Sequence, residues 1–219
     1  MFFRCITQDM AAILNSSIFD LLPKDAYLAG GTAVALYFGH RLSVDFDLFT
    51  HQGFNSLDVS AAVSEKLGPN FNITKNRITE NTLVISLDKT VFSLFTYQYP
   101  LLDKPVVIKD IPVPVASQLD LSLMKLIAIL QRGNCKDFID LKALIVQNNY
   151  TFKDLAEKLY CKYKIGSEMH LQLKKALVYF DDAEKDLNIS LYSESKKIFE
   201  TLKKDDWDTV KIFLRNFVR

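Results

Sequence analysis

Two aspartates separated by one residue, Asp45 and Asp47, give the clearest chemical signal in the chain. They lie in the alternating segment 44–49, and residues i and i+2 of a strand point to the same face. Two carboxylates so close together repel, which raises the pKa of one of them unless a cation lies between them. Because Mg²⁺ binds carboxylate oxygens and usually brings substrate phosphates with it, the pair predicts a metal and phosphate site.

A second signal precedes the aspartates. Gly30, Gly31 and Thr32 follow a short apolar run and precede a helix predicted over residues 33–38. Paired glycines at a helix start let the backbone approach a ligand closely, and the free N–H groups there favour an anion. Alone, the glycines are an ordinary turn and the aspartates an ordinary solvated strand edge. Together they predict a phosphate cradle next to a metal-holding pair, which is a nucleotide site.

A third group lies on an apolar helix predicted over residues 117–132, with Ser117 as its N-cap. Lys125 lies in the middle of this helix and shares a face with Ala128 and Arg132. Two interpretations are open: the lysine extends along apolar surface to reach solvent, or it reaches a triphosphate or base across the opening left by Ala128.

The next helix begins with two acidic residues, Asp137 and Asp140, at spacing i, i+3. Carboxylates in a first helical turn interact favourably with the positive end of the helix dipole, so their presence needs no further function.

These segments resemble the DNA polymerase β-type nucleotidyltransferases, and more closely the AbiEii/AbiGii toxin family of minimal nucleotidyltransferases. Members of that family carry GGTA followed by HR-x-S-x-D-x-D-L-F, which is matched by Gly30, Gly31, Thr32, His40, Arg41, Ser43, Asp45, Asp47, Leu48 and Phe49. A second family block is matched by Lys125, Ala128, Ile129, Arg132, Gly133, Lys136, Asp137, Phe138, Ile139, Asp140 and Leu141. The resemblance covers residues 25–147.

The resemblance implies transfer of a nucleoside monophosphate from an NTP to an acceptor hydroxyl, with Mg²⁺ or Mn²⁺ as cofactor. It also implies a toxin of a bacterial toxin–antitoxin or abortive-infection system, with the 3′ end of tRNA as acceptor and an antitoxin protein as partner. Asp45 and Asp47 would hold the metal. The nucleotide would contact Gly30, Gly31, Thr32, Arg41, Ser43, Lys125 and Arg132. Asp137 or Asp140 would act as base for the acceptor hydroxyl, or would position Lys125 or Arg132.

One residue departs from the family pattern. Relatives place a third acidic residue on a later strand, where this chain has Ser93. A serine cannot neutralise a second Mg²⁺, which argues against a symmetric two-metal mechanism. Ser93 is the main support for one alternative, a non-catalytic or weakly catalytic NTP-binding module that acts through a partner. A further alternative is nucleotidyl transfer to a protein hydroxyl.

Composition limits the class of protein. The 219 residues are 49% hydrophobic and carry a net charge of +1, which is typical of a globular chain without a global field for polyanions. Three cysteines without metal-ligand spacing predict reduced thiols and a cytoplasmic protein. No apolar run approaches the roughly 20 residues that span a bilayer, and no secretory signal begins the chain.

The pattern of elements predicts an α+β fold (α/β-like), with a mixed sheet flanked by helices and a C-terminal helical bundle. Helices are predicted over residues 8–22, 33–38, 56–67 and 117–132, and strands over 27–29, 44–49, 71–79, 82–87 and 91–97. The predicted domains are a nucleotidyltransferase domain (1–149) and a helical bundle (150–219). The bundle helices are predicted over 152–163, 169–180, 193–202 and 207–218.

Overall fold

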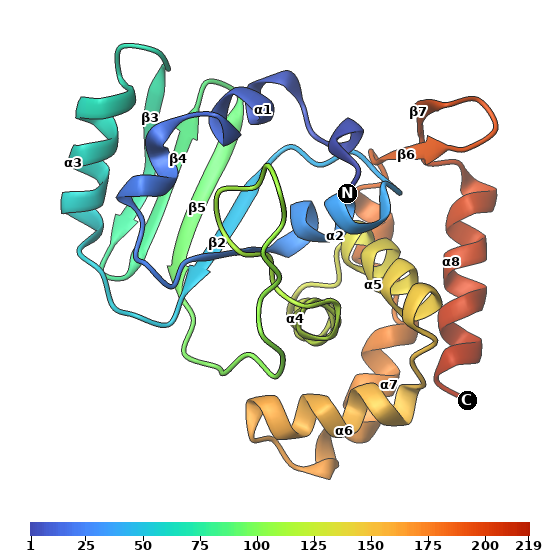
Figure 1. Cartoon of the computed structure of the whole chain (residues 1–219). Coiled ribbons are helices and arrows are strands. Elements are labelled where there is room, and N and C mark those ends of the chain that lie inside the picture. Colours follow the sequence, from blue (N-terminus) through green and yellow to red (C-terminus); the bar gives the residue numbers. More distant parts are fainter.

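A five-stranded mixed sheet forms one half of the molecule in the computed structural model, which describes residues 1–219 (Figure 1). Its strands are β1 (Tyr27–Ala29), β2 (Phe46–Thr50), β3 (Ile73–Thr79), β4 (Thr82–Leu87) and β5 (Thr90–Thr96), in the spatial order β1-β2-β5-β4-β3. β2 and β5 run parallel, and the other neighbours run antiparallel. The predicted mixed sheet is confirmed.

Short helices pack around this sheet. They are η1 (Phe3–Cys5), α1 (Gln8–Leu14), η2 (Ser17–Leu21), α2 (Gly30–Phe38) and α3 (Ser56–Leu67). The prediction of one helix over 8–22 was wrong, because the helix is interrupted at Ser16 between α1 and η2. The Ser16 hydroxyl donates to the carbonyl of Ile13 and accepts from the N–H of Ile18, so it replaces helical hydrogen bonds at this point.

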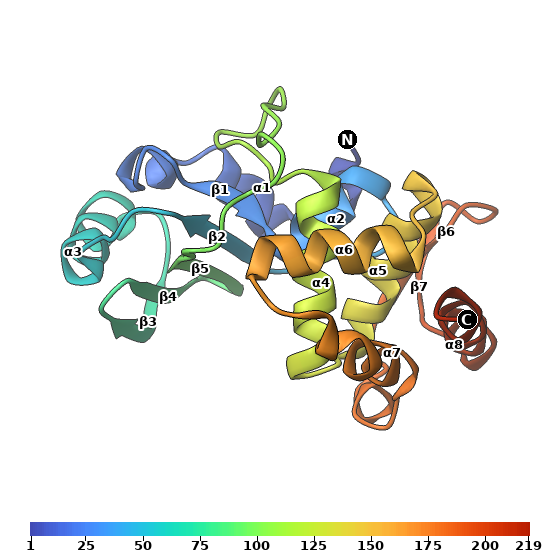
Figure 2. The same cartoon turned by 90° about the horizontal axis from the view of Figure 1, so that it is seen from below.

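The other half of the molecule is mainly helical. It contains α4 (Gln118–Gln131), α5 (Cys135–Asn148), α6 (Phe152–Tyr163), η3 (Ser167–Met169), α7 (His170–Val178), η4 (Ala183–Lys185) and α8 (Lys204–Phe217). Figure 2 shows α6 crossing α4, with α7 below α6 and α8 to its right in this view. No helix in the structure combines the length and the apolar character needed to cross a membrane.

Two hydrophobic cores meet at α4 and α5. A cluster of 26 buried residues fills the space between the sheet and its helices. A second cluster of 20 buried residues joins α4 and α5 to α6, α7 and α8, with Phe138 and Trp207 among its largest side chains. The two long helices therefore contribute to both cores, and the domain boundary at residue 150 stays a prediction.

A β-hairpin replaces the helix predicted over residues 193–202. Its strands are β6 (Ser190–Ser193) and β7 (Ile198–Thr201). Aromatic and β-branched residues favour paired strands here, and the rings of Tyr192 and Phe199 lie opposite each other with centroids 5.3 Å apart. This hairpin also pairs with the segment before β2, through a bridge between Leu191 and Arg41.

Candidate active site

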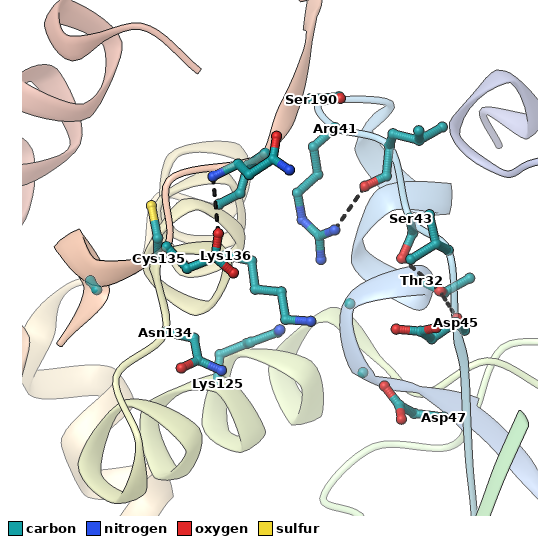
Figure 3. Close-up of a pocket in the computed structure, with 18 of the residues that line it drawn as sticks. Thr32, Arg41, Ser43, Asp45, Asp47, Lys125, Asn134, Cys135, Lys136 and Ser190 are labelled. Atoms are coloured by element: carbon teal, nitrogen blue, oxygen red, sulfur yellow. Dashed lines mark hydrogen bonds between the residues drawn. The ribbon is translucent and has the colours of Figure 1, made fainter. Parts of the chain in front are cut away.

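A pocket of about 410 Å³ lies between the two halves of the molecule (Figure 3). One side is formed by the start of α2 and the segment that leads into β2. The opposite side is formed by α4, the start of α5 and residues 182–190. The two motifs that the sequence separates by about a hundred residues therefore face each other across one cavity.

Both aspartates of the first motif point into this pocket (Figure 3). Asp45 lies within the predicted strand 44–49 but directly precedes the observed β2, and Asp47 lies within β2. Burial raises the pKa of Asp47, and the negative charge of Asp45 raises it further, while Lys125 opposes both effects. At Asp47 burial and the neighbouring carboxylate therefore outweigh the nearby cations, an environment in which a bound metal ion would favour the charged form.

The predicted alignment of Ser93 is confirmed. Ser93 on β5 is the direct partner of Asp47 on β2, and partners in a parallel pair share a face of the sheet. The structure contains no group of three His, Cys, Asp or Glu side chains arranged to hold a metal ion. A metal would therefore have two carboxylates on this sheet, with a hydroxyl where a third acid would stand.

The paired glycines make room for other side chains of the site. Gly30 has a positive φ of 63°, and a Cβ there would overlap the Asp47 carboxylate. A Cβ at Gly31 would overlap the Arg41 guanidinium. The two glycines therefore let Asp47 and Arg41 reach the pocket past the start of α2. This intramolecular reason was missing from the sequence-based interpretation, which considered only the approach of a ligand.

The hydroxyls of Thr32 and Ser43 form hydrogen bonds within the protein. Their Oγ atoms lie 2.8 Å apart, and Thr32 also donates to the backbone carbonyl of Asp45. Both residues are buried. These contacts tie α2 to the segment before β2, so they fix the position of Asp45.

Lys125 is buried at the floor of the pocket, with 6% of its side chain exposed. Its Nζ lies 2.8 Å from Asp137 Oδ1 and 2.7 Å from Asp140 Oδ2. The interpretation of Lys125 as a lysine that extends to the surface is wrong. The two carboxylates that follow it in the chain hold its ammonium group at the pocket wall.

Asp140 is the centre of this network of charges. It accepts two hydrogen bonds from Arg41, from Nε at 2.6 Å and from Nη2 at 2.8 Å. His40 Nε2 lies 2.8 Å from its Oδ1. Burial acts to raise the pKa of Asp140, but Arg41 and Lys125 outweigh burial and hold the pKa well below its usual range.

Asp137 has the same character. Burial acts to raise its pKa, but Lys125 and Arg132 lower it below the usual value. Arg132 Nε lies 3.0 Å from Asp137 Oδ2, and its half-exposed side chain borders the pocket. A carboxylate with a lowered pKa is a poor proton acceptor, and neither Asp137 nor Asp140 lines the cavity. The geometry therefore favours the positioning alternative over the base alternative.

Lys136 lines the pocket but received no separate role from the sequence. Its side chain extends across the cavity toward Asp45 (Figure 3), and it forms no salt bridge within the protein. Successive residues of a helix differ by about 100° in direction. For that reason Asp137 turns inward to Lys125 while Lys136 faces the cavity, which sequence spacing could have indicated.

The C-terminal wall of the pocket was also missed. Asp182, Asp186, Asn188 and Ser190 border the cavity. No sequence signal marks them, because the motif matches end before residue 150 and the residues are polar loop types.

Comparisons with known proteins identify the family of the chain. The family model of the nucleotidyl transferase AbiEii toxin of type IV toxin–antitoxin systems matches residues 12–212. An uncharacterized protein of Aquifex aeolicus, aq_aa25, is 35% identical over 195 residues, which covers 88% of this chain and 90% of that protein.

Two solved structures share the fold. JHP933 from Helicobacter pylori has a TM-score of 0.56 at 19% identity, covering 96% of this chain and 90% of its own. The nucleotidyltransferase toxin MenT4 (Rv2826c) from Mycobacterium tuberculosis H37Rv has a TM-score of 0.51 at 15% identity, covering 95% and 83%. The match of the family model to nearly the whole chain is decisive: the chain belongs to the AbiEii family of nucleotidyltransferase toxins.

Proposed function

We propose that this nucleotidyltransferase moves a nucleoside monophosphate from an NTP to the 3′-terminal hydroxyl of tRNA, with Mg²⁺ or Mn²⁺ bound at Asp45 and Asp47. One observation carries the proposal: the carboxylates of Asp45 and Asp47 face the ammonium groups of Lys125 and Lys136 across a single pocket. In an NTP with its bound metal, the cation would face the two carboxylates and the phosphates would face the two lysines.

The two carboxylates fit a divalent cation. Asp45 and Asp47 point to the same space, and the pKa of Asp47 is raised because its burial outweighs the nearby cations Lys125, Lys136 and Arg132. A bound Mg²⁺ or Mn²⁺ supplies Lewis-acid stabilisation of the charge that develops on the phosphates. Thr32 and Ser43 support the site indirectly, since their hydroxyls fix the backbone of Asp45.

The triphosphate would contact two groups of donors. The first backbone N–H groups of α2, at Gly30, Gly31 and Thr32, have no partner within the helix and favour an anion. On the same side, Arg41 adds a side-chain donor from the segment that leads into β2. From the opposite side, Lys125 and Arg132 supply side-chain donors, and Lys136 adds a cation that has no salt bridge within the protein.

Asp137 and Asp140 position Arg41, Lys125 and Arg132. Each carboxylate is held between two basic side chains, so it fixes the direction of their charges before the substrate arrives. Such preorganised charge stabilises a transition state without reorganisation during the reaction. Deprotonation of the acceptor hydroxyl is therefore assigned to neither residue.

Family membership supports the biological part of the proposal. A toxin of a type IV toxin–antitoxin system has a cognate antitoxin, and we propose that this chain acts beside one in the cytoplasm. We also propose that modification of tRNA is how it stops growth. Transfer to a protein hydroxyl is the alternative that the acceptor assay must separate.

The test is a transfer assay with each of the four NTPs, labelled at the α-phosphate, and Mg²⁺. The acceptors are total tRNA, tRNA whose 3′-terminal diol has been oxidised with periodate, and tRNA-free cell protein. We expect label on intact tRNA and none on oxidised tRNA. Label on protein alone would overturn the proposed acceptor, and no label on any acceptor with any NTP would overturn the proposed activity.

A further inference from the structure

The segment that carries Arg41 is held by the N-terminal residues on one side and by the hairpin strand β6 on the other. All three backbone hydrogen bonds of residues 40–43 go to Cys5 or to β6. Leu42 donates to the carbonyl of Ser190 at 2.9 Å, and Tyr192 donates to the carbonyl of His40 at 2.9 Å. On the other side, Ser43 donates to the carbonyl of Cys5 at 2.8 Å. The segment therefore lies between η1 and β6, whose proximity is visible in Figure 1.

A stack of side chains joins the two sides over this segment. The Arg4 guanidinium lies over the Tyr192 ring at 3.8 Å and over the Phe2 ring at 4.5 Å. Arg4 Nη2 also lies 3.4 Å from Glu194 Oε1. We call these four residues the end clamp.

The turn below the end clamp is shaped to admit it. Gly39 has a φ of 68° and ends α2 directly before the segment. A Cβ at Gly39 would lie 2.7 Å from Cγ of Phe2 and 2.8 Å from Nη2 of Arg4. A side chain at this position would therefore displace both residues of the N-terminal half of the clamp.

We propose that Arg4 and Tyr192 are positioning residues of the nucleotide site, which act by fixing the segment that carries Arg41. Arg41 lines the pocket and holds Asp140 through two hydrogen bonds, so a shift of its backbone moves both the guanidinium and the carboxylate network. The hairpin would thus complete the active site from the C-terminal half. This inference rests on the proposed function in one respect, the contact of Arg41 with the nucleotide.

Hydrogen exchange tests the end clamp without reference to activity. Arg4→Ala should accelerate exchange of the Leu42 and Tyr192 amides about fivefold or more, the size expected for losing two exposed cation–π contacts. Arg4→Lys keeps a cation and should lie between this variant and the parent. Lys196→Ala is the matched control, because Lys196 pairs with Glu200 within the hairpin and should leave both amides unchanged. Unchanged exchange in Arg4→Ala would overturn the clamp.

A double-mutant cycle tests the positioning role. Arg4→Ala should lower kcat/KM for the NTP about fivefold in the parent, and less than about twofold when Arg41→Lys is already present, since both changes act through one side chain. Equal losses in the two backgrounds would overturn the role.

If Arg41→Lys does not fold, the KM of Arg4→Ala for the NTP decides. A higher KM at unchanged Tm supports the positioning role, and an unchanged KM overturns it. Absence of transfer in the parent would instead refute the proposed function, and the exchange result would still decide the clamp.

Discussion

Lys125→Met offers a strong test of the buried charge network, because it removes one cation from two buried carboxylates. The Lys125 ammonium lies 2.8 Å from Asp137 and 2.7 Å from Asp140, and both carboxyl groups are fully buried. Removing one partner of a buried ion pair costs about 3–5 kcal/mol, because the other charge stays in the interior. Asp137 keeps Arg132 and Asp140 keeps Arg41, so the cost should lie near the lower limit.

The expected loss of about 3 kcal/mol corresponds to a Tm lower by roughly 6–12 °C for a chain of this size. Differential scanning calorimetry at neutral pH measures it. Lys136→Met is the matched control. It is the same substitution in the same pocket, but Lys136 is exposed and forms no ion pair. Its Tm should stay within about 2 °C of the parent. A Tm for Lys125→Met equally close to the parent would refute the buried network.

Three further predictions concern the acidic residues. Asp47→Asn should raise the Tm while lowering transfer more than about hundredfold, because it relieves repulsion with Asp45 but removes a metal ligand; a lower Tm in calorimetry would contradict the first part. Ser93→Asp should bind Mn²⁺ more tightly without nucleotide in a calorimetric titration, and equal affinity would mean that residue 93 does not reach the site. Asp137 and Asp140 have lowered pKa values, so they stabilise the fold above the ordinary aspartate pKa of about 3.9, and this stability is lost as the pH falls through their lower folded values. A Tm that does not fall over this acidic range would refute the assignment.

Local sequence rules predicted the features that depend on neighbouring residues. The strand β4 has the predicted bounds, because turn residues flank an alternating run. Ser117 caps α4 as predicted, since its hydroxyl accepts from the N–H of Asp120. The shared direction of Asp45 and Asp47 follows from the period of two in an extended chain.

The features that local rules missed depend on contacts between distant residues. Arg41 and Asp140 are 99 positions apart, and neither residue alone indicates that the other neutralises it. The hairpin at residues 190–201 contains charged residues that suit an exposed helix, but pairing of β6 with the Arg41 segment and of Tyr192 with Phe199 favours strands. Tertiary contacts of this kind override local propensity.

The position of the transferred label tests nucleotidyl transfer at Asp45 and Asp47 most directly. The parent and Asp47→Asn are each incubated with Mg²⁺, acceptor tRNA and an NTP labelled at either the α- or the γ-phosphate. We predict that the parent places the α-label on tRNA, releases the γ-label as pyrophosphate, and that Asp47→Asn does neither. Transfer of the γ-label to the acceptor, or equal α-label transfer by Asp47→Asn, would contradict nucleotidyl transfer at this site.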